Sequence, residues 1–440
     1  MYTKKDIIRL LIPAFVEMFL TAAIGVVNTI MVSGVGDFAV SGVSLVDSIN
    51  FVAVNLFMAV STGATVIIAQ QLGSGNEYKA SKTASQSITA VVIISFLTGL
   101  FLYIFNTEII NFLFGNSEQV VKSAAKTYLI CSAISYPLLG IFNIFTSILR
   151  ANNNFRASMI AAVASNIVNV SVGAICIFVL GLGVLGAGIG MILARLFGPL
   201  ILIRPLFKNP KIKISKLSYK MDLKVLKPVL YIGIPAGMDS LVFNGGKLLV
   251  QSLVASLGIV SLTANSIANS LNTIISIPGN AIAVVAVTVI GFYAGAGLKE
   301  EMKKMMKKFT VYSMLLLAGV SIIILPFAGS IIKLYSPTPQ VIELALQVTH
   351  LTLICVPIFW SAAFILPSCL RSAGDVVFVT VISISSMWII RVFGGYLLVK
   401  YTSLGLMGIW VAWCFDWVTR GAPFLGRFLS RKYEKHLPKI

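Results

Sequence analysis

Long apolar segments, separated by short polar ones, recur along the chain from end to end. Each has about 18 residues or more, which is enough to cross about 30 Å of hydrocarbon as an α-helix. The alternating pattern of membrane β-strands is not visible, so a transmembrane β-barrel is not expected. The pattern predicts twelve membrane-spanning helices, at residues 7–34, 47–72, 84–106, 124–149, 157–180, 184–206, 226–256, 268–294, 309–334, 344–370, 375–399 and 403–427.

Composition agrees with a polytopic membrane protein. Of 440 residues, 58% are hydrophobic and 11% are charged, and the mean hydropathy is +0.95, far from the balance of a soluble domain. The net charge of +19 would suggest nucleic acid binding in a soluble chain. Here Lys and Arg gather at the N-terminus and in every second loop, with eight between residues 204 and 227. This positive-inside pattern predicts a multi-pass protein of the cell (inner) membrane with both termini cytoplasmic.

Matching residues recur at a spacing of 222 positions. The matched pairs are Pro13 and Pro235, Glu17 and Asp239, Asp47 and Asn269, Asn50 and Asn272, Gly75 and Gly297, and Gly183 and Gly405. We therefore predict two homologous six-helix bundles, an N-terminal lobe at 1–206 and a C-terminal lobe with a short cytoplasmic tail at 225–440. A basic cytoplasmic linker, 207–224, joins them. An even number of spans gives both lobes the same orientation, so rocking of one against the other exposes a central cleft to alternate sides.

Two acids lie deep in predicted spans. Glu17 and Asp239 occupy the matched positions of the first and seventh spans, each following an Ile-Pro-Ala. A carboxylate within the membrane is costly, so each is a candidate for proton or sodium coupling. The alternative is a structural hydrogen bond from a protonated acid. Thr21 and Asn28 lie on the same helix face as Glu17 and extend a polar stripe along the first span.

Several classes of function and site are not expected. The chain has no phosphate-binding loop with Gly-Lys-Ser/Thr and no nucleophile–base set, so an enzyme is not predicted and an ion gradient must supply the energy. All five cysteines fall within spans without metal-binding spacing, and His350 and His436 stand alone. We therefore expect no cofactor, no disulfide framework and no metal centre.

The chain resembles multidrug and toxic compound extrusion (MATE) transporters of the bacterial type along nearly its whole length. The stretches that carry the resemblance are NTIMVSGVGDFAVSGVSLVDSIN (28–50), LRANNNFR (149–156) with SNIVNV after it, GLGVLGAGIG (181–190), GIPAGMDS (233–240), ASLGIVSLTANSIANS (255–270) and LRSAGDV (370–376). The resemblance implies an all-α membrane protein, with two six-helix lobes around a V-shaped cavity. It also implies export of amphipathic or cationic drugs, toxins and dyes in exchange for Na⁺ or H⁺.

The chain departs from this family at two coupling positions. Asn28 stands where members usually have an aspartate, and Gly173 stands where many have another. A neutral residue cannot titrate, so we assign coupling to Glu17 and Asp239. Asn28 and Asn169 are then expected cation ligands, with a sodium ion at Glu17 and Asn28 or at Asp239. The expected cavity residues are Thr21, Asp47, Asn50, Lys247, Asn269 and Asn272.

Two other functions stay open. One is a flippase for a lipid-linked precursor, as in relatives of the same superfamily, for which Lys247, Arg195 and Arg391 are the available phosphate-binding cations. The other is a receptor or scaffold that uses the basic central loop to bind anionic lipid or nucleic acid. The favoured partners are a small-molecule substrate and membrane lipid, without nucleic acid, and the expected state is a monomer.

Overall fold

The predicted apolar segments are helical in the computed structural model, which describes residues 2–115, 117–214, 221–335 and 337–438. All regular elements of these residues are helices. Eleven spans among them are long and apolar enough to cross a membrane. The twelfth predicted span corresponds to α16 (Leu406–Leu429), which carries Asp416, Arg420 and Arg427 in its sequence. The all-helical membrane fold expected from the sequence is therefore confirmed.

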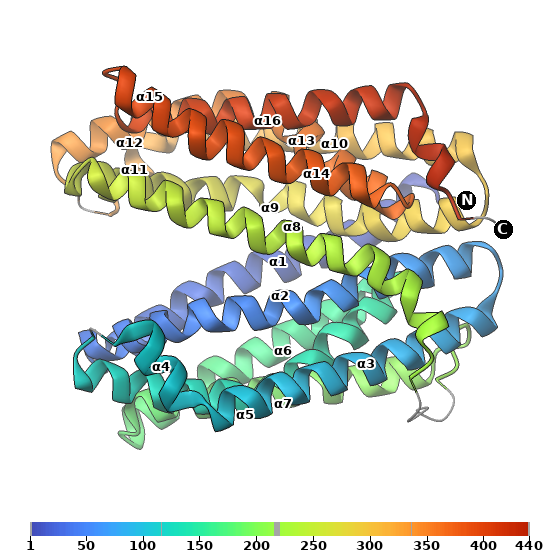
Figure 1. Ribbon diagram of the computed structural model, residues 1–440, viewed down its shortest axis with the longest axis horizontal. Helices are drawn as coiled ribbons and strands as arrows, with labels where there is room; N and C mark the ends of the chain where they lie inside the picture. The colour runs from blue at the N-terminus through green and yellow to red at the C-terminus, as the bar shows by residue number, and fades with distance from the viewer. Residues whose placement is uncertain (1, 116, 215–220, 336, 439–440) are drawn as a thin grey trace. The chain divides into compact units, whose positions relative to one another are not determined.

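Contacts divide the chain into two compact units, and the first is Met1–Gly237. Its helices lie side by side in Figure 1, and α5 contacts both α2 and α7 extensively. A core of apolar residues that includes Phe57, Leu129 and Tyr136 fills the space between α2, α3, α4 and α5. The elements are α1 (Lys4–Ser33), α2 (Asp37–Gly73), α3 (Glu77–Ile104), α4 (Asn106–Phe114), α5 (Gln119–Ala151), α6 (Phe155–Ala174), η1 (Ile175–Val179), α7 (Gly183–Phe207) and the beginning of α8 (Leu223–Ser256).

The second unit is Met238–Ile440 and begins within α8. Three of its predicted spans contain a change of helix type, and two of these changes are π-helical turns, which widen a helix locally and often mark functional positions. The elements after α8 are α9 (Ile259–Gly295), α10 (Lys299–Ile324), η2 (Leu325–Phe327), α11 (Ala328–Lys333), α12 (Pro339–Cys355), η3 (Val356–Trp360), α13 (Ser361–Ser372), α14 (Val376–Ser386), η4 (Met387–Gly394), α15 (Gly395–Tyr401), α16 and η5 (Lys432–His436).

The boundary between the two compact units lies within α8, and residues 215–220 of the predicted linker at 207–224 lie outside the described part of the chain. The beginning of α8 belongs to the first unit because that segment packs closely on α2. A Cβ added to Gly63 would lie 2.0 Å from the Val229 carbonyl oxygen, and one added to Gly233 would lie 2.3 Å from the Ala59 carbonyl oxygen. Glycine on both helices therefore lets the two backbones touch, a contact that hydropathy does not reveal.

The 222-residue spacing is repeated in the backbone. The helices α2 and α9 both have 37 residues, and they begin 222 positions apart. The turns before them contain Gly36 and Gly258, with φ values of 134° and 92°, which side chains other than glycine rarely tolerate. Because these turns lead directly into helices, the segments 35–46 and 257–267 that were expected to be loops are mostly helical.

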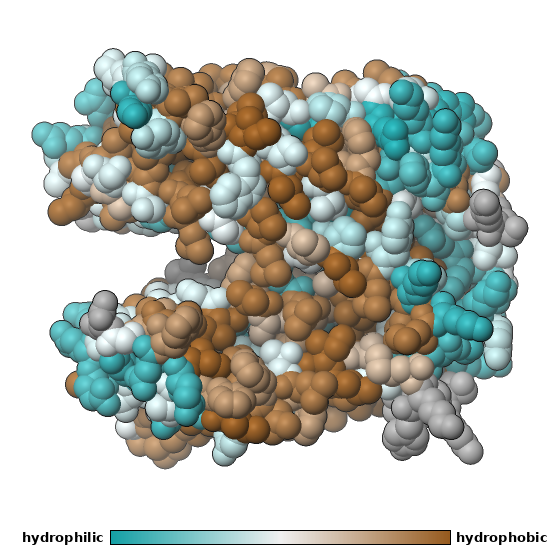
Figure 2. Space-filling model, in the orientation of Figure 1, coloured by the Kyte–Doolittle hydropathy of each residue, from teal (hydrophilic) through white to brown (hydrophobic). Residues whose placement is uncertain are grey.

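Apolar side chains on the outside of each unit fit a lipid environment. Ile30, Leu248 and Ile322 are exposed by 63%, 72% and 71%, fractions that water would disfavour in a contiguous surface. Figure 2 shows hydrophobic side chains over the middle of the helices and hydrophilic ones gathered toward the helix ends. The units are therefore built for a hydrocarbon layer flanked by water.

The Gly63→Ala variant is expected to destabilise the first unit strongly. The added methyl group would overlap the Val229 carbonyl, and backbone atoms cannot move aside as a flexible side chain does. Overpacking of this kind costs about 1–3 kcal/mol and occasionally more. Thermal unfolding of the detergent-purified protein measures the effect. Gly25→Ala is the matched control, since no atom lies within 4 Å of its added Cβ; equal melting temperatures for the two variants would contradict the packing described here.

Candidate functional site

Glu17 forms an ion pair within the first unit. It lies near the middle of α1, and its Oε1 is 2.5 Å from Nη2 of Arg150, in the last turn of α5. Glu17 is only 8% exposed. Its second carboxylate oxygen and the Arg150 Nε are buried without a hydrogen-bond partner. The pair therefore connects α1 with α5. One carboxylate oxygen and one guanidinium nitrogen of the pair can still accept or donate a hydrogen bond.

Asp239 forms the equivalent pair within the second unit. Its Oδ2 lies 2.8 Å from Nη2 of Arg371, in the last turn of α13. Asp239 is near the middle of α8, as Glu17 is near the middle of α1. The Arg371 Nε is buried without a partner, as is that of Arg150. The same acid–arginine pair has thus been built twice, once in each unit.

Sequence comparison of the two halves contained the signal for this pairing. Glu17 and Asp239 are 222 residues apart, and Leu149-Arg150-Ala151 corresponds to Leu370-Arg371-Ser372 at a spacing of 221. Periodicity cannot show that the acid and the arginine meet, because they lie 133 and 132 positions apart along the chain. The arginines were therefore missing from the predicted site.

The predicted cation ligands on α1 and α6 lie away from Glu17. Since α1 is one continuous helix, Asn28 is about 16 Å from Glu17 along its axis, at 1.5 Å per residue. Those two side chains therefore do not bind one sodium ion together. A Cβ added to Gly173 would lie 2.8 Å from the Met31 Cε, so α1 and α6 approach closely one turn beyond Asn28 and Asn169. Both asparagines are half-buried.

Asp47 and Asn50 lie in a polar network of the first unit. The Tyr136 hydroxyl donates to Asn50 Oδ1 over 2.7 Å, and Asn50 Nδ2 approaches Asp47 Oδ1 at 3.4 Å. Arg195 donates to the neighbouring Ser135 hydroxyl at 2.6 Å. No Lys or Arg nitrogen in the described ranges forms an ion pair with the Asp47 carboxylate. Asp47 is therefore a carboxylate without an ion-pair partner among the described residues, in contrast to Glu17 and Asp239.

In the described part of the chain, the predicted cavity residues Asn269, Asn272 and Lys247 form no side-chain hydrogen bond or ion pair with Asp239. Asn269 Nδ2 donates to the Asn265 carbonyl over 3.0 Å, and Asn272 Oδ1 is buried without a partner. Lys247 is exposed, and its Nζ lies 5.2 Å from the centre of the Phe243 ring.

The predicted cavity residue Thr21 belongs to the first unit. It is also exposed, and its hydroxyl donates to the Glu17 carbonyl over 2.8 Å.

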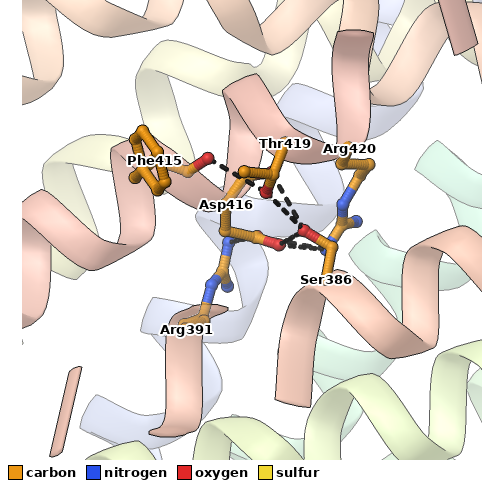
Figure 3. Close-up of polar contacts among 6 residues, drawn as sticks. All are labelled: Ser386, Arg391, Phe415, Asp416, Thr419 and Arg420. Carbon is orange, nitrogen blue, oxygen red and sulfur yellow. Dashed lines mark hydrogen bonds and ion pairs between the residues drawn. The ribbon is translucent and has the colours of Figure 1, made fainter. Parts of the chain in front are cut away.

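A second charged cluster of the second unit is fully buried. Figure 3 shows Asp416 of α16 between Arg391 of η4 and Arg420 one turn farther along α16. The Asp416 Oδ2 is 2.7 Å from Arg391 and 3.1 Å from Arg420. The Ser386 hydroxyl donates to Asp416 Oδ1 over 2.6 Å. Asp416 and Arg420 are four residues apart and so share a face of α16, whereas only the fold reveals the partner of Arg391.

The arrangement offers sites for ions and charged compounds. In the described part of the chain, no three His, Cys, Asp or Glu side chains come together as a metal site. The candidate groups are instead single carboxylates, two of them held by arginines, and a cluster that contains more arginines than acids. Single carboxylates in a low-dielectric region bind protons or monovalent cations reversibly, which is the chemistry of ion-coupled transport.

Comparison with known proteins identifies the family. The family model described as MatE matches residues 13–175 and again 235–397, so that its two matches begin 222 residues apart. The probable multidrug resistance protein NorM of Thermotoga maritima is 28% identical over 441 residues, covering 98% of this chain and 93% of that protein. The uncharacterized transporter YisQ of Bacillus subtilis is 27% identical, covering 95% of this chain and 92% of its own length.

Solved structures share the fold. An outward-facing multidrug resistance MATE family transporter of the MOP superfamily has a TM-score of 0.90 at 21% identity, with coverage of 98% of this chain and 97% of that one. The crystal structure of a MATE in complex with MaL6 has a TM-score of 0.91 at 19% identity, with the same coverage. The family expected from the sequence is confirmed. Because the family model matches most of the chain in two copies, the chain belongs to the MatE family of membrane transporters, which are not enzymes.

Proposed function

We propose that this transporter is a secondary antiporter of the cell membrane. It exports small amphipathic or cationic compounds in exchange for Na⁺ or H⁺ by alternating access, and its termini lie in the cytoplasm. Family membership and the multidrug resistance of similar proteins, as their names state, support the class of cargo. The lysine- and arginine-rich central loop and tail support the orientation.

The duplicated acid–arginine pair is the observation that carries the proposal. In the paired state, Arg150 neutralises Glu17 and Arg371 neutralises Asp239. A proton or sodium ion that binds the carboxylate replaces the arginine as its counter-charge. The pair then opens, and the helix with the acid is no longer fixed to the end of the other helix. Ion binding in this way allows the helix that carries the acid to move, as a coupled transporter requires.

The coupling ion and a cationic compound compete for the same carboxylate, and this competition accounts for the exchange of one for the other. A carboxylate that has bound a coupling ion attracts a cationic compound less strongly, so the two ligands disfavour each other's binding. Asp47 contributes a further negative charge to the first unit without an ion-pair partner among the described residues. Apolar and aromatic residues can accept compounds of varied shape by contact alone. With these properties, an inward ion gradient can drive the export of cations of varied structure.

Transport by reconstituted vesicles tests the proposal. A fluorescent cationic dye is enclosed with the protein in proteoliposomes, and sodium and pH gradients are imposed separately. We expect dye movement to accelerate under one of the gradients and to stop when an ionophore dissipates it. Empty vesicles give the leak rate. Dye movement at the leak rate under both gradients, with protein that is correctly folded, would exclude antiport of this cargo.

The flippase remains a second candidate because of one observation. The cluster around Asp416 has two buried guanidinium groups for a single carboxylate, and Lys247 is close by. Excess positive charge of this kind suits a phosphate-bearing lipid precursor better than a cation. Translocation of a labelled anionic lipid across proteoliposomes, at a rate above that of an unrelated membrane protein, would favour this alternative.

A further inference from the structure

The cluster around Asp416 lacks negative charge. Arg391 is 1% exposed, Arg420 is 3% exposed and Asp416 is fully buried. Within the described residues, Asp416 is the only acid in ion-pair contact with either arginine. One positive charge is thus left without a counter-charge in a region that lipid surrounds. An unpaired charge in such a place is costly and usually marks a binding function.

Several donors of the same cluster have no acceptor. The Nε and Nη1 atoms of Arg391 and the Nε atom of Arg420 are buried without a hydrogen-bond partner. The Nε1 atom of Trp417, the residue after Asp416 on α16, is also buried without a partner. Buried donors are almost always satisfied in folded proteins, and each exception calls for an explanation. An oxygen ligand of negative charge would satisfy both the donors and the charge.

One aromatic ring connects this cluster with the surface. The Phe243 ring of α8 lies 5.0 Å from the Arg391 guanidinium, 5.1 Å from that of Arg420 and 5.2 Å from Lys247 Nζ. Lys247 is exposed and Phe243 is half-buried. Three cations around one ring repel each other, and a ring quadrupole compensates only part of that repulsion. The cluster therefore extends from the buried arginines to a cation that a ligand can reach.

We propose that Arg391, Arg420 and Lys247 form a binding site for an oxyanion group beside Phe243. The proposal rests on the proposed export function and adds that cargo with a carboxylate is accepted in the second unit. Guanidinium groups bind carboxylate and phosphate oxygens in the same planar geometry. The flanking rings of Phe243, Phe364 and Trp413 favour an oxyanion attached to an apolar body. The phosphate of an anionic lipid offers the same oxygen chemistry.

Tryptophan fluorescence can report binding in this unit alone. All five tryptophans of the chain lie in it, at Trp360, Trp388, Trp410, Trp413 and Trp417. The Trp413 ring lies 4.4 Å from the Arg391 guanidinium. Benzoate is titrated into the full-length protein in neutral detergent, and benzyl alcohol and benzylammonium provide the neutral and cationic comparisons. We expect benzoate to change the emission saturably at concentrations at least about tenfold below those of either comparison compound, as for a charge-assisted hydrogen bond.

Two variants and one matched control assign the effect. Arg391→Gln leaves one arginine for one carboxylate, and Lys247→Gln changes an exposed residue, so both are expected to fold. Each should raise the benzoate concentration at half-saturation by about tenfold or more. Lys400→Gln is the control, because Lys400 also lies over aromatic rings, 5.6 Å from Tyr396, but belongs to α15. It should leave the titration unchanged.

Nanodiscs distinguish the source of the oxyanion. If the site accepts cargo carboxylates, benzoate should bind equally well in phosphatidylcholine and in phosphatidylglycerol nanodiscs. If lipid phosphate is the ligand, phosphatidylglycerol should suppress benzoate binding, and the site itself is still supported. Identical titrations for benzoate and benzylammonium, or unchanged benzoate binding in both variants, would overturn the proposal. These experiments measure binding and not transport. They therefore test the oxyanion site even if gradient-driven dye export is not observed.

Discussion

Export driven by an ion gradient is expected to disappear when Glu17→Gln and Asp239→Asn are combined in one chain. Each amide keeps the size of the side chain but cannot bind a proton, and it binds sodium weakly. Both ion pairs are lost together, so neither unit retains its switch. We expect dye export in vesicles to fall to the leak rate, a loss of about a hundredfold or more, as for removal of groups essential to a mechanism.

Matched variants separate coupling from folding in this experiment. Glu343→Gln removes an exposed carboxylate of α12 and should export at the normal rate. Arg150→Gln breaks the same ion pair as Glu17→Gln but keeps the acid, so export should persist at a lower maximal rate, with half-saturation at a lower ion concentration. The double variant must remain monodisperse for the result to count. Gradient-driven export by the folded double variant would refute the role of both acids.

The Asp416→Asn variant is expected to cause the largest loss of stability. A neutral amide at this position would leave Arg391 and Arg420 as two buried guanidinium groups without an anion, and breaking a buried pair costs about 3–5 kcal/mol. Arg391→Gln should cost much less or nothing, because it removes the surplus charge and leaves one pair. Thermal unfolding in detergent, followed by tryptophan fluorescence, measures both variants.

The more accessible ion pair between Asp375 and Arg427 provides the comparison. Asp375 lies 2.6 Å from Arg427, whose side chain is 18% exposed. Asp375→Asn should lower the melting temperature less than Asp416→Asn, since the released arginine can reach water. If Asp416→Asn were as stable as the unmodified chain, or if Arg391→Gln were the more damaging change, the charge imbalance of the cluster would be refuted.

Hydropathy was sufficient to predict the helical elements, and internal repetition predicted the two matched halves, whereas the family was inferred from the resemblance of short stretches such as GIPAGMDS (233–240). Apolar runs identify membrane helices because lipid imposes the same requirement on every span. The 222-residue spacing located the matched acids because both halves keep them in the same sequence context, at Pro13 and Pro235. It also located Gly75 and Gly297, whose φ values are 75° and 69°. Such features depend on the local chain alone.

The contacts between distant helices could not be predicted in this way. Nothing in the spacing of Arg150 and Arg371 indicates an acid 133 or 132 positions away. The division of the chain within α8 depends on glycine contacts with α2, which have no hydropathy signature. Arg391 lies 25 positions from Asp416, a spacing that does not indicate their contact. A shared counter-charge becomes apparent only in three dimensions.

Release of the coupling ion upon cargo binding tests the central claim most directly. Detergent-purified protein is equilibrated in weak buffer with a pH indicator, or with radioactive sodium, and a cationic dye is added. We expect the dye to displace protons or sodium from the unmodified chain, and we expect Glu17→Gln combined with Asp239→Asn to abolish this release. Dye that binds with unchanged affinity while releasing neither ion, or release that is undiminished in the double variant, would contradict the central claim.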